Sequence, residues 1–241
     1  MRWWALLTFL FSVQLFAETL DVAAEDAWPP FSDASGNGYS RQLAEAAFKL
    51  SGITLNVQTV PYARALNMTK GGSVDACWNV TRQPSTEVDY IFGSVPLFQA
   101  AASYFYKRGQ ARDFHRPEDI PDGTRVAVIN GYEYGQEFEH NKKRFKLIEV
   151  SKQTQMLALL LNDRVDVAIM FDHVYDYIMS SQFLDKSAYE KGYTNHISDI
   201  YIAFSRQNES SSRYAKLLDE GLLKLKESGE YDRIMNSAPV I

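Results

Sequence analysis

The stretch MTKGGSVDACW (residues 68–78) ends a helical segment, turns through two glycines and enters an apolar strand at Val74-Asp75. The stretch LLLNDRVDVAI (residues 159–169) repeats this order, with Val165-Asp166 at the start of its strand. A helix that feeds a buried strand through a tight turn is the repeating unit of a parallel α/β sheet. Two copies of the unit predict two similarly built α/β lobes with a cleft between them.

The segments around each copy alternate between strand and helix. The pattern predicts strands over 19–24, 53–60 and 74–80 and helices over 39–50 and 62–70 in the first series. It predicts strands over 125–129, 146–150 and 165–170 and helices over 134–140, 153–161 and 173–180 in the second.

Two further strands, over 100–107 and 200–204, bracket the second series and predict that the chain crosses between the lobes near Tyr104 and Tyr201. The last helices, which carry an apolar stripe from Tyr214 to Leu225, are expected to pack back on the first lobe. The predicted division is residues 18–104 plus 201–241 for lobe 1 and 105–200 for lobe 2.

Residues 1–17 are typical of a cleavable signal peptide, with Arg2, an apolar run over 3–16 and a small residue, Ala17, before the expected cut. A membrane anchor is the alternative, but the run is shorter than the roughly 20 apolar residues that a spanning helix needs. We therefore expect a periplasmic protein.

Composition excludes several functional classes. The formal net charge of −5 would become −6 after loss of the leader, because the leader contains one charged residue, Arg2. An acidic chain whose one dense basic run (140–146) is short predicts no nucleic-acid partner. Cys77, the single cysteine, allows no intramolecular disulfide and lies in an apolar strand, which favours an inert buried thiol.

No metal-binding or catalytic motif occurs, and the four histidines are scattered, so we expect no metal, no cofactor and no catalytic residue. Gly36-Asn37-Gly38 lacks a third glycine and is interpreted as a turn. Asp75 and Asp166 precede buried strands and are expected to fix the turns there.

Aromatic, charged and amide side chains gather where the predicted strands end, and the carboxyl ends of such strands face the ligand crevice. Flat rings with a few charges suit a small polar or cationic ligand. These residues are Glu25, Trp28, Phe31, Tyr62, Arg64, Trp78, Asn79, Arg82, Asn130, Gly131, Tyr132, Phe171 and Asp172.

Each has a structural alternative. Trp28 and Phe31 could close the end of the sheet, Arg64 and Arg82 could be surface charges, and Asp172 could only cap the helix that follows it.

The chain resembles the family-3 solute-binding proteins of ABC importers, the group that binds polar amino acids, over nearly all of its mature length. Single motifs of this kind are weak, but their order and spacing are specific. The motifs are Trp28-Pro29-Pro30-Phe31, Gly72-Ser73-Val74-Asp75-Ala76, Thr81-Arg82-Gln83-Pro84 and the run from Arg164-Val165-Asp166-Val167 to Asp172.

The resemblance implies the two-lobed periplasmic binding protein fold (type II), with two crossing segments as a hinge. It implies that Glu25 and Asp172 hold a ligand amine and that Trp28 stacks on the ligand. The arginine that clamps the ligand carboxylate in the family is missing, since Thr86 stands at its place, and Arg82 or Arg64 would have to substitute.

A second departure is Gly131-Tyr132-Glu133, which stands where the family has Gly-Thr-Thr and replaces two hydroxyl groups by a ring and a carboxyl. Because of both departures, we expect a cationic, amine-bearing or aromatic ligand. The predicted ligand-binding residues are Glu25, Trp28, Tyr62, Arg64, Trp78, Asn79, Arg82, Tyr132 and Asp172.

The resemblance thus predicts a monomeric solute-binding protein that traps a small molecule and delivers it to an ABC permease in the inner membrane. One alternative is a dehydratase-like enzyme on the same scaffold, with Glu133 or His173 as the acid or base. Another is a sensor module that presents its ligand to a receptor.

Overall fold

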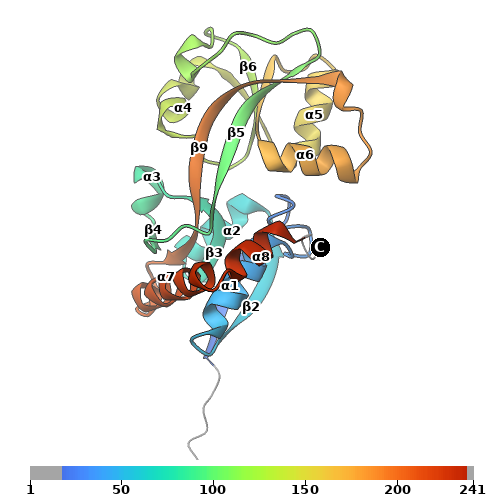
Figure 1. Cartoon of the computed structure of the whole chain (residues 1–241). Helices are drawn as coiled ribbons and strands as arrows, with labels where there is room; N and C mark the ends of the chain where they lie inside the picture. The colour runs from blue at the N-terminus through green and yellow to red at the C-terminus, as the bar shows by residue number, and fades with distance from the viewer. Residues whose placement is uncertain (1–17, 238–241) are drawn as a thin grey trace, which may run out of the picture.

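The computed structural model of the chain describes residues 18–237, so the predicted signal peptide lies outside the described residues. Figure 1 shows two groups of elements linked by two long strands that run side by side, β5 (Phe98–Lys107) and β9 (Tyr189–Ser205). We call the lower group in Figure 1 the first lobe and the upper group the second lobe.

The first lobe consists of two chain segments, and the second lobe lies between them in sequence. The elements of the first lobe are β1 (Glu18–Glu25), α1 (Tyr39–Lys49), β2 (Ile53–Val60), α2 (Tyr62–Lys70), β3 (Ala76–Thr81), α3 (Pro84–Glu87), β4 (Tyr90–Phe92), α7 (Ser211–Glu227) and α8 (Glu230–Asn236). The elements of the second lobe are β6 (Arg125–Ile129), α4 (Gln136–Asn141), β7 (Lys146–Val150), α5 (Gln153–Leu161), β8 (Val167–Phe171) and α6 (Asp172–Ser181).

One mixed sheet runs through both lobes in the order β2-β1-β3-β9-β5-β8-β6-β7, and β4 pairs with β9. Within the first lobe β1 is parallel to β2 and β3, and within the second lobe β6 is parallel to β7 and β8. Strand β9 is antiparallel to β3 at one end and to β5 along the rest. The lobe boundaries drawn near Tyr104 and Tyr201 stay a prediction, because β5 and β9 pass from one lobe to the other as continuous strands.

The repeated Val-Asp turn has the same hydrogen bonds in both lobes. The Asp75 carboxylate accepts the backbone N–H of Asp21 at 2.8 Å, and the Asp75 N–H donates to the carbonyl of Asp21 at 2.9 Å. Asp166 exchanges the corresponding bonds with Arg125, at 2.8 and 2.9 Å. The prediction that both aspartates fix turns is confirmed.

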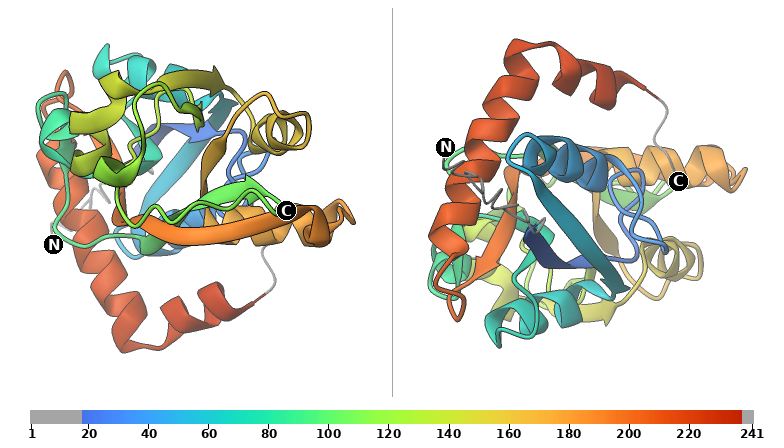
Figure 2. Two further views of the ribbon diagram at one scale, coloured as in Figure 1. Left: turned by 90° about the horizontal axis from the view of Figure 1, so that it is seen from above. Right: turned by 90° about the horizontal axis from the view of Figure 1, so that it is seen from below.

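The C-terminal helices pack on the first lobe, as predicted. Figure 2 shows α7 running along one side of this lobe. The chain changes direction at Gly229, whose φ of 76° suits glycine, and continues into α8, which also contacts α1. At the contact with α1, a Cβ on Gly221 would lie 2.6 Å from the carbonyl oxygen of Ala47, so only glycine allows this approach.

Several elements differ from their prediction. Strand β9 begins at Tyr189, well before the predicted strand over 200–204, and α4 begins at Gln136, two residues later than predicted. The short elements α3 and β4 were not predicted. Among residues 18–237, none of the helices has both the length and the apolar character needed to cross a membrane.

Candidate functional site

Side chains from both lobes meet around one small cavity at the carboxyl ends of the strands. Its volume of about 10 Å³ is close to the space that a single water molecule needs. The protein's own side chains therefore fill most of the space between the lobes at this point. The lining residues are Trp28, Tyr62, Asn79 and Thr81 from the first lobe and Tyr132, Glu133 and Phe171 from the second.

Glu25, at the end of β1, forms the first contact between the lobes. The Tyr132 hydroxyl of the second lobe donates a hydrogen bond to Glu25 Oε1, and Asn79 Nδ2 donates to Glu25 Oε2 at 3.3 Å. Glu25 is only 2% exposed, and this burial raises the pKa of its carboxyl to about 8, although the two hydrogen bonds act to lower it. The carboxyl is thus largely protonated at neutral pH.

Glu133 forms a second contact between the lobes, in which the carboxyl belongs to the second lobe and the tyrosine to the first. The Tyr62 hydroxyl of the first lobe donates to Glu133 Oε2 at 2.8 Å. Burial raises the pKa of the Glu133 carboxyl to about 8 as well, against the lowering effect of the Tyr62 hydrogen bond. The rings of Tyr62 and Tyr132 meet edge to face, with centroids 4.9 Å apart. Each lobe therefore contributes one buried carboxyl and one tyrosine to the contact.

Asn79 is positioned by an unusual backbone. Its φ of 70° lies in the left-handed region, and the pairing of β3 with β9 shifts register between Cys77 and Val80. The Ser40 hydroxyl donates to Asn79 Oδ1 at 2.5 Å, which leaves the amide nitrogen for Glu25. Such backbone conformations concentrate at functional sites.

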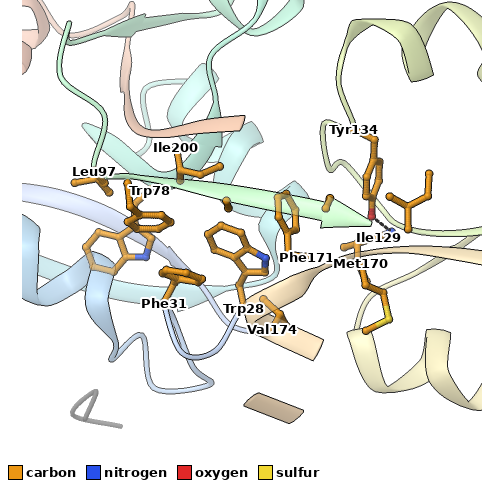
Figure 3. Packing of buried hydrophobic residues seen from close by; sticks show 14 of the residues in the cluster. Trp28, Phe31, Trp78, Leu97, Ile129, Tyr134, Met170, Phe171, Val174 and Ile200 are labelled. Carbon is orange, nitrogen blue, oxygen red and sulfur yellow. Dashed lines mark hydrogen bonds between the residues drawn. The ribbon is translucent and has the colours of Figure 1, made fainter. Parts of the chain in front are cut away.

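Trp28 belongs to the core and lines the cavity, and its stacking on a ligand stays a prediction. Figure 3 shows its indole between Phe31 and Phe171, with ring centroids 4.7 and 4.8 Å away. Trp28 is only 2% exposed. The loop that carries Trp28 packs closely against Gly38, just before α1. A Cβ on Gly38 would lie 2.3 Å from the carbonyl oxygen of Phe31, so a larger residue would not fit there.

Five predicted site residues are absent from the lining of this cavity. Glu25 is one of them, although it bonds Tyr132 and Asn79, which do line it. Trp78 is fully buried within the first lobe, and its Nε1 donates to the Ser32 hydroxyl at 3.2 Å. Asp172 pairs with Lys191 at 2.7 Å, away from the cavity, and the preceding residue, Phe171, lines it instead.

The two arginines are also elsewhere. Arg64 is exposed on α2. Arg82 forms an ion pair with Glu87 at 2.6 Å and donates to the carbonyl of Gly93 at 3.0 Å. Thr86, at the place of the family's clamping arginine, bonds the backbone around the start of α3. Neither arginine lines the small cavity, and the expectation that one of them replaces the clamp stays a prediction.

Phe171 and Glu133 line the cavity without being among the predicted ligand contacts, and Gln153 lines a neighbouring cavity. Phe171 was already a candidate because it ends a predicted strand, and Glu133 could have been found as the neighbour of Tyr132. Gln153, the first residue of α5, is 2% exposed, and neither polar atom of its side chain has a hydrogen-bond partner among the described residues. Only the structure reveals this unpaired amide.

Two larger cavities flank the contact, and residues of both lobes line each of them. One, of about 410 Å³, lies between the Pro29–Asp33 region and the start of α5, and Gln153 is part of its wall. The other, of about 560 Å³, lies beside β9 and includes Arg82 and Tyr201. Both have the size of small-molecule sites.

The remaining candidate groups have structural roles. Cys77 is buried as predicted, and burial raises the pKa of its thiol to about 12. Asn37 closes the predicted turn by accepting the N–H of Asp33 at 2.8 Å. Over the described part of the chain, no group of three or more histidine, cysteine or acidic side chains is placed to hold a metal ion.

Comparison with known proteins gives a family and a fold. The family model of the bacterial extracellular solute-binding proteins, family 3, matches residues 20–237. No curated protein sequence matches the chain.

Solved structures match over almost the whole chain. An ancestral arginine-binding protein bound to arginine is 21% identical, with a TM-score of 0.75 over 90% of this chain and 96% of that one. An arginine transport-system periplasmic binding protein from Legionella pneumophila is 18% identical, with a TM-score of 0.75 over 92% and 99%. A histidine kinase sensor domain similar to periplasmic binding proteins is 21% identical, with a TM-score of 0.74 over 90% and 94%. The fold is thus that of the two-lobed type II periplasmic binding proteins.

Proposed function

Because the chain belongs to family 3 of the bacterial extracellular solute-binding proteins, we propose that it captures a small polar molecule between its two lobes. The ligand would be an amino acid, an amine or a related compound. The observation that carries this proposal is the reciprocal contact between lobes, in which Tyr132 bonds Glu25 and Tyr62 bonds Glu133. A ligand that replaced these contacts would touch both lobes and would stabilise only the closed form. Periplasmic binding proteins are a standard case of such closure.

The paired strands β5 and β9 would act as the hinge. Their pairing shifts register between Ala102 and Ser103 and again between Ser103 and Phe105. Irregular pairing at this point supports bending there rather than within either lobe.

We further propose that the protein acts as a periplasmic monomer that hands its ligand unchanged to an ABC permease in the inner membrane. The relative from a bacterial arginine transport system supports this role. The enzyme alternative gains no support from the site, because Glu133 is tied to Tyr62 and His173 is exposed beside Phe31.

A thermal-shift screen of residues 18–241 against amino acids, amines and organic acids tests the binding role. Ligand at 100 times its dissociation constant should add about 2.7 kcal/mol, which corresponds to a rise of roughly 5–10 °C in Tm. The bound compound should be recovered chemically unaltered. A compound consumed during incubation would contradict the binding role.

A sensor module is the second candidate, because a histidine kinase sensor domain has the same fold. Uptake of the labelled ligand by cells that lack the protein distinguishes the roles. Transport predicts that uptake falls, whereas sensing predicts unchanged uptake and a lost transcriptional response.

A further inference from the structure

The lining of the small cavity between the lobes includes the acidic Glu133 and no basic residue, although Lys142 and Lys152 line neighbouring cavities. Glu25 and Glu133, one from each lobe, are 2% and 9% exposed, and each accepts a hydrogen bond from a neutral tyrosine of the opposite lobe. No lysine, arginine or histidine is among the residues that line the cavity there. Two buried carboxyls without a cation are an unusual arrangement, since buried acidic groups are normally paired.

A ligand carboxylate would be poorly accommodated at this contact. It would lie beside two acidic side chains in a region with little water, and no basic side chain in the lining of the cavity would balance its buried charge. The basic residues of the surrounding elements are paired or exposed. Arg82 pairs with Glu87, Lys142 pairs with Glu139, and Arg64 and Lys152 are exposed.

A cation would be well accommodated. Glu25 and Glu133 can each accept hydrogen bonds from an ammonium group in place of the tyrosine hydroxyls. Around them, Trp28, Tyr62, Tyr132 and Phe171 present aromatic rings, which attract a cation over their faces. Gln153, whose amide is buried without a partner, offers a further donor and acceptor beside the neighbouring 410 Å³ cavity.

We propose that the site takes an organic cation that carries no carboxylate, an amine or diamine, held between Glu25 of the first lobe and Glu133 of the second. This inference rests on the proposed function, since it names the ligand class of the same site. The cavity at the closed contact has a volume of only about 10 Å³, which is too small for an amine. The ligand therefore enters when the lobes separate and Tyr132 and Tyr62 leave the two carboxyls.

Matched pairs of compounds that differ by one carboxylate test the proposal by isothermal titration calorimetry at pH 8.5. The pairs are agmatine and L-arginine, 1,4-diaminobutane and L-ornithine, and phenethylamine and L-phenylalanine; L-glutamate and L-glutamine serve as further amino-acid probes. In at least one pair the amine should bind, and at least tenfold more tightly than its amino acid.

Glu25→Gln and Glu133→Gln should each weaken amine binding at least tenfold, while Glu137→Gln, an exposed residue of α4, should leave it unchanged. Circular dichroism and Tm establish that each variant folds, and either variant alone suffices for the test. Tighter binding of the amino acids would overturn the cation proposal and leave the proposed function standing. No binding of any probe by the folded protein would overturn both, and amine binding unaffected by both variants would overturn the assigned site.

Discussion

The Tyr132 hydroxyl donates a hydrogen bond to Glu25, the residue that we propose as an acceptor for the ligand's amine. If the proposal holds, this hydroxyl and the ligand compete for the same carboxyl. Replacing Tyr132 by phenylalanine removes the donor but keeps the ring. We expect the closed form to lose about 1–2 kcal/mol relative to the open form, a shift of roughly 5–30-fold in their ratio.

Small-angle X-ray scattering without ligand should then give a larger radius of gyration for Tyr132→Phe than for the parent protein. Tyr193→Phe, at an exposed tyrosine on β9, is the matched control and should leave the radius unchanged. Equal radii for all three proteins would show that the hydroxyl does not hold the lobes together.

The two carboxyls predict that closure depends on pH. In the closed form burial raises the pKa of Glu25 and Glu133 to about 8, whereas in an open form water would return both to the ordinary value of about 4.5. Between these values the closed form binds more protons than the open form, so closure is favoured at low pH and lost as pH rises through 8. A difference of one in a single pKa is worth about 1.4 kcal/mol.

Fluorescence energy transfer between dyes on the two lobes, measured without ligand from pH 5 to 9, should fall as pH rises. The double variant Glu25→Gln/Glu133→Gln carries neutral amides at every pH and should show a flat profile. A parent profile as flat as that of the variant would contradict the prediction.

The site also shows how far the sequence can place single residues. Glu25, Tyr62 and Tyr132 could be placed from the sequence because each lies at the end of a strand or shortly after it. The sequence could not show which of Phe171 and Asp172 faces the cleft. Strand β8 is buried along its whole length, so it has no alternation of polar and apolar residues that would indicate this. Arg64 and Arg82 were assigned as substitutes for the carboxylate-clamping arginine that this sequence lacks. The absence of that arginine does not indicate where in the sequence a substitute would stand.

At the scale of elements, the repeated Val-Asp turn joins a helix to a strand and ties both to a neighbouring strand. The Asp166 carboxylate accepts hydrogen bonds from the backbone and guanidinium of Arg125. Asp166→Ala should therefore lower the free energy of unfolding by about 1–3 kcal/mol and Tm by roughly 2–12 °C.

Because this turn is remote from the cavity, ligand affinity should not change in the folded variant. Thermal melting monitored by circular dichroism gives the stability, with Asp122→Ala as a control, since the Asp122 side chain is 79% exposed. A variant as stable as the parent would mean that the repeated turn is dispensable.

Most elements could be predicted because burial of one face imposes a periodic pattern of apolar residues on the sequence. The bounds of β2, α2, β6, β7 and α5 agree with the prediction residue for residue. The first half of β9 could not be predicted, because several residues there are exposed, including Tyr193 and Ile197, and no apolar alternation is required.

At the scale of the whole molecule, the sheet continues from one lobe into the other through β9 and β5. Loss of either lobe would leave these strands without partners on one side. We therefore predict a single cooperative thermal transition, with the calorimetric enthalpy equal to the van't Hoff enthalpy in differential scanning calorimetry. Two resolved transitions would show that the lobes unfold independently.

The position of β9 in the sheet also affects how the protein is made. Strand β3 lies between β1 and β9, and β9 ends at Ser205, so a ribosome must pass this residue before β3 can gain its second neighbour. Until then the nascent first lobe presents a bare strand edge, which is the kind of surface that chaperones shield and that drives aggregation. Release of prematurely terminated chains would for the same reason yield insoluble fragments rather than a small stable domain.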